Sequence, residues 1–504
     1  MCYDIIKILR NQRRINLKNQ VSLKLNFFMN IILTLSSIIF PLITFPYVSR
    51  ILQPEAWGKV NMAISFITYF SYFAQLGLPT YGVKICAQYR DNREKLSRTV
   101  QELSIICAIA TLITYIALAI VITSIPMLYA EKNLYLLVSS TLFFNLIGME
   151  WLYKALEKYT YITFRSIIFK IIALIAMFLL IKSESDYIIY GGISVFASSA
   201  SNICNFIEAK KYVSFKPLGN YNFKQHLKPL FILFAMTCAS TIYTNLDTVM
   251  LGFMTTNTDV GYYNAAIKIK SLLVAVVTSL STVLLPRASY YIENDLFTEF
   301  KKISSKALNF IFIIALPMIL YFIVFARECI FFLSGDKFEA SIIPMQIIMP
   351  TLLFIGLTNI LGIQILIPLG KEKYVLYSTI AGAVTDLILN TILIPSYKSC
   401  GAAVGTLVAE LVVLIVQLIL IGKDIRRMFR SFQFSKMFFA SAIALLCTYQ
   451  IKNTSLHVFF ILIISAIIFF GIYGLLLILF KEPFTCEIKN NILNKLMKKS
   501  KPDT

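Results

Sequence analysis

Long apolar stretches alternate with short polar segments along the chain, from about residue 26 to residue 480. Most of these stretches reach the roughly 20 residues that an α-helix needs to cross the hydrocarbon core of a membrane. We therefore predict an all-α integral membrane protein with about 14 transmembrane helices. The predicted spans are 26–49, 58–82, 103–125, 133–153, 163–181, 187–207, 229–254, 262–286, 307–326, 342–367, 374–394, 401–421, 436–451 and 456–480.

The composition supports this class and excludes several others. Hydrophobic residues make up 58% of the chain and charged residues only 14%, which is outside the range of ordinary soluble domains. The nine cysteines include no C-x-x-C pair, so neither a disulfide framework nor a zinc site is expected. No P-loop motif is present, and the short loops carry no set of residues suited to catalysis. The chain therefore offers little to a membrane enzyme, and we expect no catalytic residues, bound metal or cofactor.

Basic residues lie mainly on one side of the predicted spans. Of the 47 Lys and Arg residues, about 36 fall in alternate segments, eight fall in the intervening segments, and three lie inside spans. Because Lys and Arg are retained on the cytoplasmic side during insertion, both termini are predicted to be cytoplasmic. The net charge of +21 then faces the anionic lipids of the inner leaflet, and no nucleic acid partner is expected.

Two short sequence patterns recur at similar offsets. Segment 58–64 (GKVNMAI) resembles 261–267 (GYYNAAI), and 145–150 (NLIGME) resembles 359–364 (NILGIQ). Six predicted spans separate each pair, which indicates a duplicated six-helix unit whose two copies share one topology. We predict a basic cytoplasmic segment (1–25), an N-terminal six-helix lobe (26–210), a cytoplasmic linker (211–228), a C-terminal six-helix lobe (229–425), helices 13 and 14 (436–480) and a basic cytoplasmic tail (481–504).

Charged residues inside the predicted spans are the candidate functional groups, because burying a charge in the bilayer is costly. Asp247 and Lys268 lie at similar depths, about 10 Å from the outer ends of their helices. They are predicted to pair, either as a static ion pair or as a gate in which Lys268 takes an anionic group of the substrate.

Further charges flank both predicted lobes. Glu150, Lys154, Arg165 and Lys170 surround the turn between spans four and five. Lys154 and Arg165 are expected to reach the lipid headgroups, whereas Lys170 lies about 10 Å inside the membrane. Asp386 and Glu410 occupy adjacent spans, where they are candidates either for coupling to H⁺ or Na⁺ or for hydrogen bonds between helices. 

The chain resembles the Wzx-type polysaccharide flippases of the multidrug/oligosaccharidyl-lipid/polysaccharide exporter superfamily. The resemblance extends over roughly residues 25 to 480, and it is carried by the segments 46–61, 148–159, 245–252, 261–266, 285–287 and 394–403 together with Glu410. It implies export of undecaprenyl-diphosphate-linked oligosaccharide repeat units across the bacterial cytoplasmic membrane by alternating access. Polysaccharide assembly proteins are further implied partners. By analogy with the related lipid II flippases, helices 13 and 14 would form a groove for the lipid tail.

Two sets of candidate residues follow from the resemblance and from the buried charges. Basic side chains suit the diphosphate of such a substrate. The candidates for substrate binding are Arg50, Lys154, Arg165, Lys170, Lys268, Lys270 and Arg287, and those for gating or ion coupling are Glu150, Asp247, Asp386 and Glu410. Two alternatives remain open: a drug/cation antiporter of the same superfamily, which the acidic residues would suit, and a membrane polysaccharide polymerase or ligase.

Overall fold

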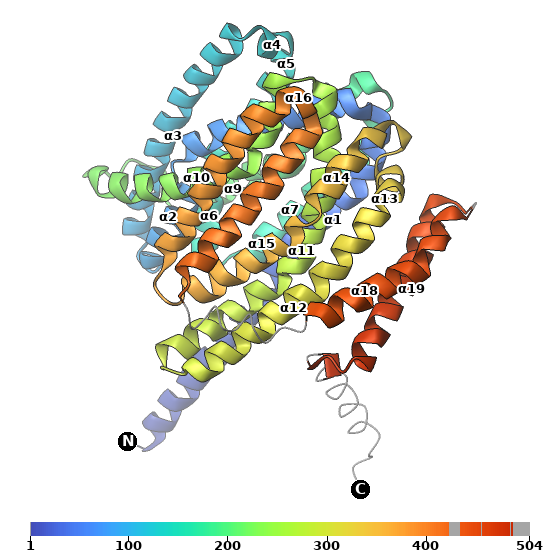
Figure 1. Ribbon diagram of the computed structural model, residues 1–504. Helices are drawn as coiled ribbons and strands as arrows, with labels where there is room; N and C mark the ends of the chain where they lie inside the picture. Colours follow the sequence, from blue (N-terminus) through green and yellow to red (C-terminus); the bar gives the residue numbers. More distant parts are fainter. Residues whose placement is uncertain (1, 423–433, 455, 484, 487–504) are drawn as a thin grey trace. The chain divides into compact units, whose positions relative to one another are not determined.

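The computed structural model describes residues 2–422, 434–454, 456–483 and 485–486. Every regular element within these ranges is helical, which confirms the all-α prediction (Figure 1). Among the described residues, nine helices are long and apolar enough to cross a membrane, or ten if a bent pair at 336–366 counts as one span. The protein is therefore a multi-pass membrane protein. The number of fourteen spans and the cytoplasmic placement of both termini stay predictions.

The chain divides into two compact units. Unit 1 comprises Met1–Leu52 and Lys59–Thr241, and unit 2 comprises Gln53–Gly58 and Ile242–Thr504. The division falls within helix α10 (Lys224–Met254). Before it come α1 (Cys2–Gln75), α2 (Leu78–Gln88), α3 (Arg93–Ser124), α4 (Pro126–Ala130), α5 (Lys132–Gly148), α6 (Glu150–Ala155), α7 (Tyr159–Leu180), η1 (Glu184–Asp186), α8 (Tyr187–Val195), η2 (Phe196–Ala200) and α9 (Asn202–Ala209).

The elements after α10 belong to unit 2. They are α11 (Asn257–Glu293), α12 (Phe297–Val324), α13 (Ala326–Leu333), η3 (Asp336–Ser341), α14 (Ile342–Ile348), α15 (Thr351–Asn359), η4 (Ile360–Leu366), α16 (Glu372–Leu420), α18 (Phe434–Tyr449), η6 (Gln450–Asn453) and α19 (Val458–Leu479). The predicted thirteenth and fourteenth spans correspond to α18 and α19, which lie side by side (Figure 1). The hydroxyl of Tyr321 on α12 donates to the Leu462 carbonyl of α19 at 2.9 Å and so ties this pair to unit 2.

Single residues with non-helical backbone break the longest helices. Gln53 (φ 59°) interrupts α1, and Lys398 (φ 51°) interrupts α16 just after Pro395. A positive φ is costly for a residue other than glycine, and proline removes a helical N–H donor. Each break is therefore a specific feature that the surrounding fold stabilises. The two legs of α16 correspond to the predicted spans 374–394 and 401–421. Met149 (φ 43°) likewise separates α5 from α6 within the predicted fourth span.

The first recurring sequence pattern has a structural reason within unit 2. A Cβ atom on Gly58 would lie 1.8 Å from the Asn257 carbonyl oxygen, and a Cβ atom on Gly261 would lie 2.0 Å from the Pro54 carbonyl oxygen. Each glycine therefore packs against backbone just before the other. The reciprocal contact requires glycine at both positions, as expected for two related helix starts that meet.

The two predicted basic ends, 1–25 and 481–504, cannot be followed in the same way. Helix α1 begins at Cys2, but the side chains of residues 1–24 are outside the part of the chain that the structure describes, as are residues 487–504 of the tail.

Candidate functional site

A cluster of hydrogen-bonded polar side chains surrounds Asp247 in the interior of unit 2. Asp247 on α10 accepts hydrogen bonds from the Thr406 hydroxyl (2.9 Å), from the Asn390 amide (2.6 Å) and from the Tyr263 hydroxyl. Tyr263 lies on α11, and Asn390 and Thr406 lie on the two legs of α16. All four side chains are at least nine-tenths buried. The Asp247 carboxylate thus joins three helical segments at one point.

Asp386, one helical turn before Asn390, adds a second buried carboxylate to this cluster. Its side chain is 1% exposed and interacts electrostatically with Asp247, Lys270 and Glu410. Gly405 allows the second leg of α16 to come close, because a Cβ atom there would lie 2.2 Å from Asn390 Oδ1. The structure therefore brings together Asp247 and Asp386, with Glu410 near them, from three predicted spans.

The cluster contains oxygen atoms that are available to coordinate a cation. Within the part of the chain that the structure describes, the Oδ1 atoms of Asp386 and Asn390 are buried and receive no hydrogen bond. A buried acceptor without a donor costs roughly 1–3 kcal/mol, and a cation or proton placed between these oxygens would remove that cost. Carboxylate, amide and hydroxyl oxygens are also the ligand types that hard cations prefer. The arrangement suits reversible binding of H⁺ or Na⁺.

The predicted ion pair between Asp247 and Lys268 is wrong. Both side chains are described, and no salt bridge joins them, because the Asp247 carboxylate is occupied by Tyr263, Asn390 and Thr406. Depth along a helix does not fix rotation about its axis. Five residues separate Tyr263 from Lys268, so their side chains point about 140° apart. Tyr263 faces Asp247, and Lys268 therefore does not.

A cation lies within the helices of unit 1. The Lys170 ammonium on α7 donates hydrogen bonds to Ser36 Oγ (3.0 Å) and Ser37 Oγ (2.9 Å) on α1. Among the residues that the structure describes, its hydrogen bonds reach no carboxylate. Neutral hydroxyl groups therefore bind the ammonium directly, while the Glu150 carboxylate acts on it electrostatically without a hydrogen bond.

Arg165 lies five residues before Lys170 and contacts a different part of unit 1. Its Nη1 atom donates to Ser201 Oγ (2.8 Å) and Asn202 Oδ1 (3.1 Å), and the residue is only 6% exposed. The expectation that Arg165 reaches lipid headgroups is wrong, because polar groups at the start of α9 bind its guanidinium inside the unit. A cavity of about 570 Å³ adjoins it, and Lys158 is also in the lining.

The other candidate residues lie in different surroundings. Glu150 and Lys154 form a salt bridge of 2.8 Å across one turn of α6, and Glu150 also interacts electrostatically with Arg165 and Lys170. Arg50 and Arg287 are exposed, and Lys268 is half-buried. Lys270 interacts with Asp386, so it belongs with the carboxylate cluster.

Sequence reasoning missed three members of the cluster. Asn390 is four residues after Asp386, and Thr406 is four residues before Glu410, so helical spacing from the predicted carboxylates would have found both. Tyr263 has no such signal, because it lies on another helix from every predicted acid of the cluster.

Comparison with known proteins identifies the family. A family model described as "Polysaccharide biosynthesis protein" matches residues 23–292, and a MatE model matches residues 233–392. A relative from Escherichia coli (strain K12), named as an O-antigen transporter, is 25% identical over 81% of this chain and 98% of its own length.

Two solved structures share the fold. The lipid II flippase MurJ in an inward closed conformation matches with a TM-score of 0.73, at 18% identity over 90% of this chain and 98% of its own. An inward-facing multidrug resistance MATE family transporter matches with a TM-score of 0.58, at 12% identity over 78% and 95%. The chain belongs to the polysaccharide biosynthesis protein family, the polysaccharide flippases of the multidrug/oligosaccharidyl-lipid/polysaccharide exporter superfamily, and it is a transporter rather than an enzyme.

Proposed function

We propose that this protein moves undecaprenyl-diphosphate-linked oligosaccharide repeat units from the inner to the outer leaflet of the bacterial cytoplasmic membrane by alternating access. The observation that carries this proposal is the presence of two basic side chains on α7 of unit 1, Arg165 buried and Lys170 half-buried. Lys170 and Arg165 lie on a predicted transmembrane helix and hydrogen-bond to hydroxyl and amide groups. Charge inside a membrane is retained mainly for function, and a lipid-linked diphosphate is an anion that must pass through this region.

In this proposal, the carboxylate cluster of unit 2 couples movement of the substrate to binding of a cation. Binding of one H⁺ or Na⁺ between Asp247 and Asp386 would neutralise one of two carboxylates that the fold places together and relieve their mutual repulsion. Such neutralisation changes the contacts among α10, α11 and the two legs of α16. A ligand shifts a conformational equilibrium only by its differential affinity for the two states, and this cluster supplies a place where that difference can arise.

The lipid tail has a proposed place as well. Helices α18 and α19 present apolar side chains, and large exposed ones include Phe439, Leu446, Ile467 and Leu475. By resemblance to the lipid II flippases, we assign this pair to the polyprenyl chain. Anionic lipids of the inner leaflet and other polysaccharide assembly proteins are the further partners in this proposal.

Deletion of the gene in its host tests the function. The expected result is loss of the surface polysaccharide together with lipid-linked oligosaccharide stranded on the cytoplasmic leaflet, measured by its inaccessibility to an added glycosidase. Wild-type protein should restore exposure, whereas Lys170→Met should restore little. Outer-leaflet exposure that is normal without the gene would contradict the proposal.

A drug/cation antiporter is the second candidate, favoured by the buried carboxylates and by the MatE model match over residues 233–392. It predicts that the deletion strain becomes sensitive to cationic drugs while its lipid-linked oligosaccharide is exposed normally. The two functions therefore give opposite results in the same strain.

A further inference from the structure

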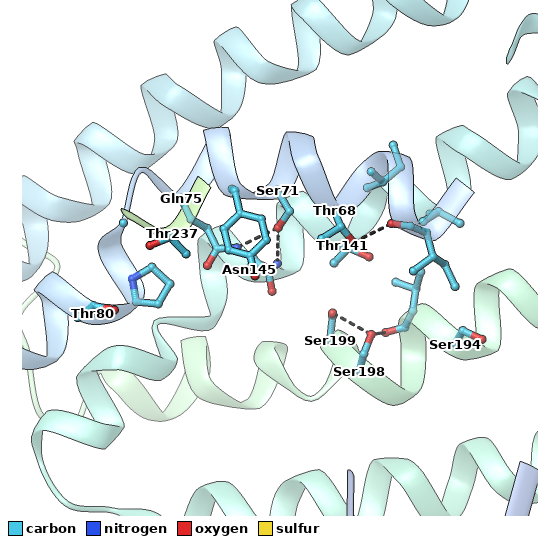
Figure 2. A pocket seen from close by; sticks show the side chains of 17 residues that line it. Thr68, Ser71, Gln75, Thr80, Thr141, Asn145, Ser194, Ser198, Ser199 and Thr237 are labelled. Atoms are coloured by element: carbon cyan, nitrogen blue, oxygen red, sulfur yellow. Dashed lines mark hydrogen bonds between the residues drawn. The ribbon is translucent and has the colours of Figure 1, made fainter. Parts of the chain in front are cut away.

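A cavity inside unit 1 has none of the charged candidate residues, such as Lys170, Arg165 and Asp247, in its lining. Its volume is about 570 Å³, within the range of about 300–1,000 Å³ that is usual for ligand pockets. Segments of α1, α2, α5, α8, η2 and α10 line it (Figure 2). None of its 17 lining residues is charged, and most carry an uncharged polar group: Thr68, Ser71, Tyr72, Gln75, Thr80, Thr141, Asn145, Ser194, Ser198, Ser199 and Thr237.

Two irregular backbone segments meet this cavity. Leu76 (φ 45°) and Gly77 (φ 74°) separate α1 from α2, and Gly77 and Pro79 are in the lining. Ser198 and Ser199 line another part and belong to η2, a π-helical turn. Non-helical backbone at membrane depth is tolerated where it is buried in protein or borders a polar cavity, and π-helical turns are frequent at functional sites. Both irregular segments therefore indicate that the cavity is a specific binding site.

The polar groups of the cavity are oriented by hydrogen bonds. The amide nitrogens of Gln75 and Asn145 donate to the Ser71 hydroxyl oxygen at 2.9 and 3.2 Å, as Figure 2 shows. Each amide is thus fixed by its nitrogen, and each also brings a carbonyl oxygen, which is an acceptor for a hydroxyl donor. Thr80, Thr141 and neighbouring hydroxyl groups add both donors and acceptors.

We infer that this cavity is a subsite for an uncharged, hydroxyl-bearing ring, namely a sugar residue of the translocated oligosaccharide. The inference rests on the proposed function and assigns one part of the substrate. Hydroxyls of a sugar match the amide and hydroxyl groups, its C–H faces match the aliphatic lining, and Tyr72 supplies an aromatic group. A diphosphate finds no cation here, and a cationic drug finds no carboxylate.

Binding to the full-length protein in lipid nanodiscs tests the inference by titration calorimetry with two probes. One probe is the lipid-free oligosaccharide released by mild acid from the host's lipid carrier, and the other is undecaprenyl diphosphate without sugar. The variants are Thr141→Val and Thr80→Val, which remove a hydroxyl at nearly constant volume. Each should raise the Kd for the oligosaccharide about tenfold and leave the Kd for undecaprenyl diphosphate unchanged. Thr391→Val is the matched control, because Thr391 is exposed and its hydroxyl bonds to its own helix at the Leu387 carbonyl.

A second measurement follows protection of one lining position and does not depend on a change in affinity. Ser198 is exposed within the lining, so Ser198→Cys should react with a maleimide, and the oligosaccharide should slow that reaction at least fivefold. Unchanged labelling and unchanged affinity of both valine variants would overturn the subsite while leaving the flippase function intact. Equal weakening of both probes would also overturn it. Failure of the wild-type protein to bind either probe would contradict the flippase function itself.

Discussion

Unit 1 and unit 2 differ in the sign of the charge that they bury within their predicted spans. Among the described side chains inside those spans, unit 1 buries the Arg165 guanidinium, whereas unit 2 buries the carboxylates of Asp247, Asp386 and Glu410. The contrast concerns the spans only, because unit 1 also buries Glu102, which pairs with His226 just before a span, and Lys268 and Lys270 of unit 2 are half-buried. The cations of unit 1 hydrogen-bond to Ser and Asn side chains, and Asp247 of unit 2 receives hydrogen bonds from Tyr, Asn and Thr. The recurring sequence patterns predict that the two halves are copies. If they are, the proposed function assigns an anion to the buried charge of one copy and a cation to that of the other.

Under the proposed function, this difference would place substrate binding in unit 1 and cation binding in unit 2. Each ligand would then act on its own set of helices. The predictions below test that separation, beginning with the largest expected effect.

Asp247→Asn should nearly abolish export. The substitution removes a carboxylate and turns an N–H₂ group toward the Tyr263, Asn390 and Thr406 donors, so it removes both cation affinity and hydrogen bonds worth about 1–3 kcal/mol. Surface polysaccharide in a deletion strain complemented by the variant measures the effect. Asp336→Asn is the control, because Asp336 is an exposed aspartate of the same unit. Full export by the Asp247 variant would contradict a role for Asp247 in cation binding.

Lys170→Met should lower export about tenfold, the effect of losing roughly 1.4 kcal/mol of interaction with a diphosphate. The variant should insert and fold normally, because methionine fits an apolar helix surface and Ser36 and Ser37 can bond to their own backbone. Lys182→Met is the control, because Lys182 follows the end of α7 and its side chain is exposed. An equal loss in both variants would show that positive charge at this depth has no special role.

Gly58→Ala and Gly261→Ala should each destabilise the protein by about 1–3 kcal/mol, because the added methyl group meets a backbone carbonyl at about 2 Å. Thermal unfolding in detergent measures the change. Gly471→Ala on α19 is the control, since a Cβ atom there meets nothing within 4 Å. The loss of stability should be similar in the Gly58 and Gly261 variants. If these two losses differ from each other as much as they differ from the control, the two contacts are not equivalent, and the duplication loses this support.

Asp186→Asn should have the smallest effect, and that effect should depend on pH. The backbone N–H groups of Lys182 and Ser183 donate to Asp186 at 2.9 and 2.8 Å and hold the pKa of this exposed carboxyl below its usual value. A lowered pKa stabilises the folded state above about pH 4, and that contribution is lost as the pH falls through the folded-state pKa. Unfolding midpoints of variant and wild type should therefore differ slightly at pH 7 and approach each other as the pH falls below about 4. Asp91, which is almost fully exposed, provides the control substitution Asp91→Asn.

The fold was largely predictable from the sequence because membrane spans depend on the length of apolar runs. The runs located α7 and α19 closely, whereas α12 begins ten residues before its predicted span; the duplication that the recurring glycines indicated stays a prediction, and their close backbone contacts give both glycines a packing role. Breaks within runs were less predictable. Gln53 and Lys398 fall at predicted polar turns, but the π-helical turn η2 lies within an apolar run and has no local sequence signal.

The candidate site was predictable in its residue types and less so in its contacts. Rarity of charge inside spans identified Asp247, Asp386 and Glu410, which the structure brings near one another. Pairing required the rotation of each helix about its axis, which spacing along one helix does not give. For that reason Lys268 was expected beside Asp247, where Tyr263 lies instead.

Transport in proteoliposomes tests the division between the two units most directly. The protein is reconstituted with a fluorescent undecaprenyl-diphosphate-linked sugar, and its appearance in the opposite leaflet is followed with and without a gradient of H⁺ or Na⁺. The account predicts that a gradient of one of these cations accelerates wild-type transport, that Asp247→Asn abolishes the acceleration, and that Lys170→Met slows transport but keeps the same relative acceleration. Wild-type transport that responds to neither gradient, or a Lys170 variant that loses the response as the Asp247 variant does, would contradict it.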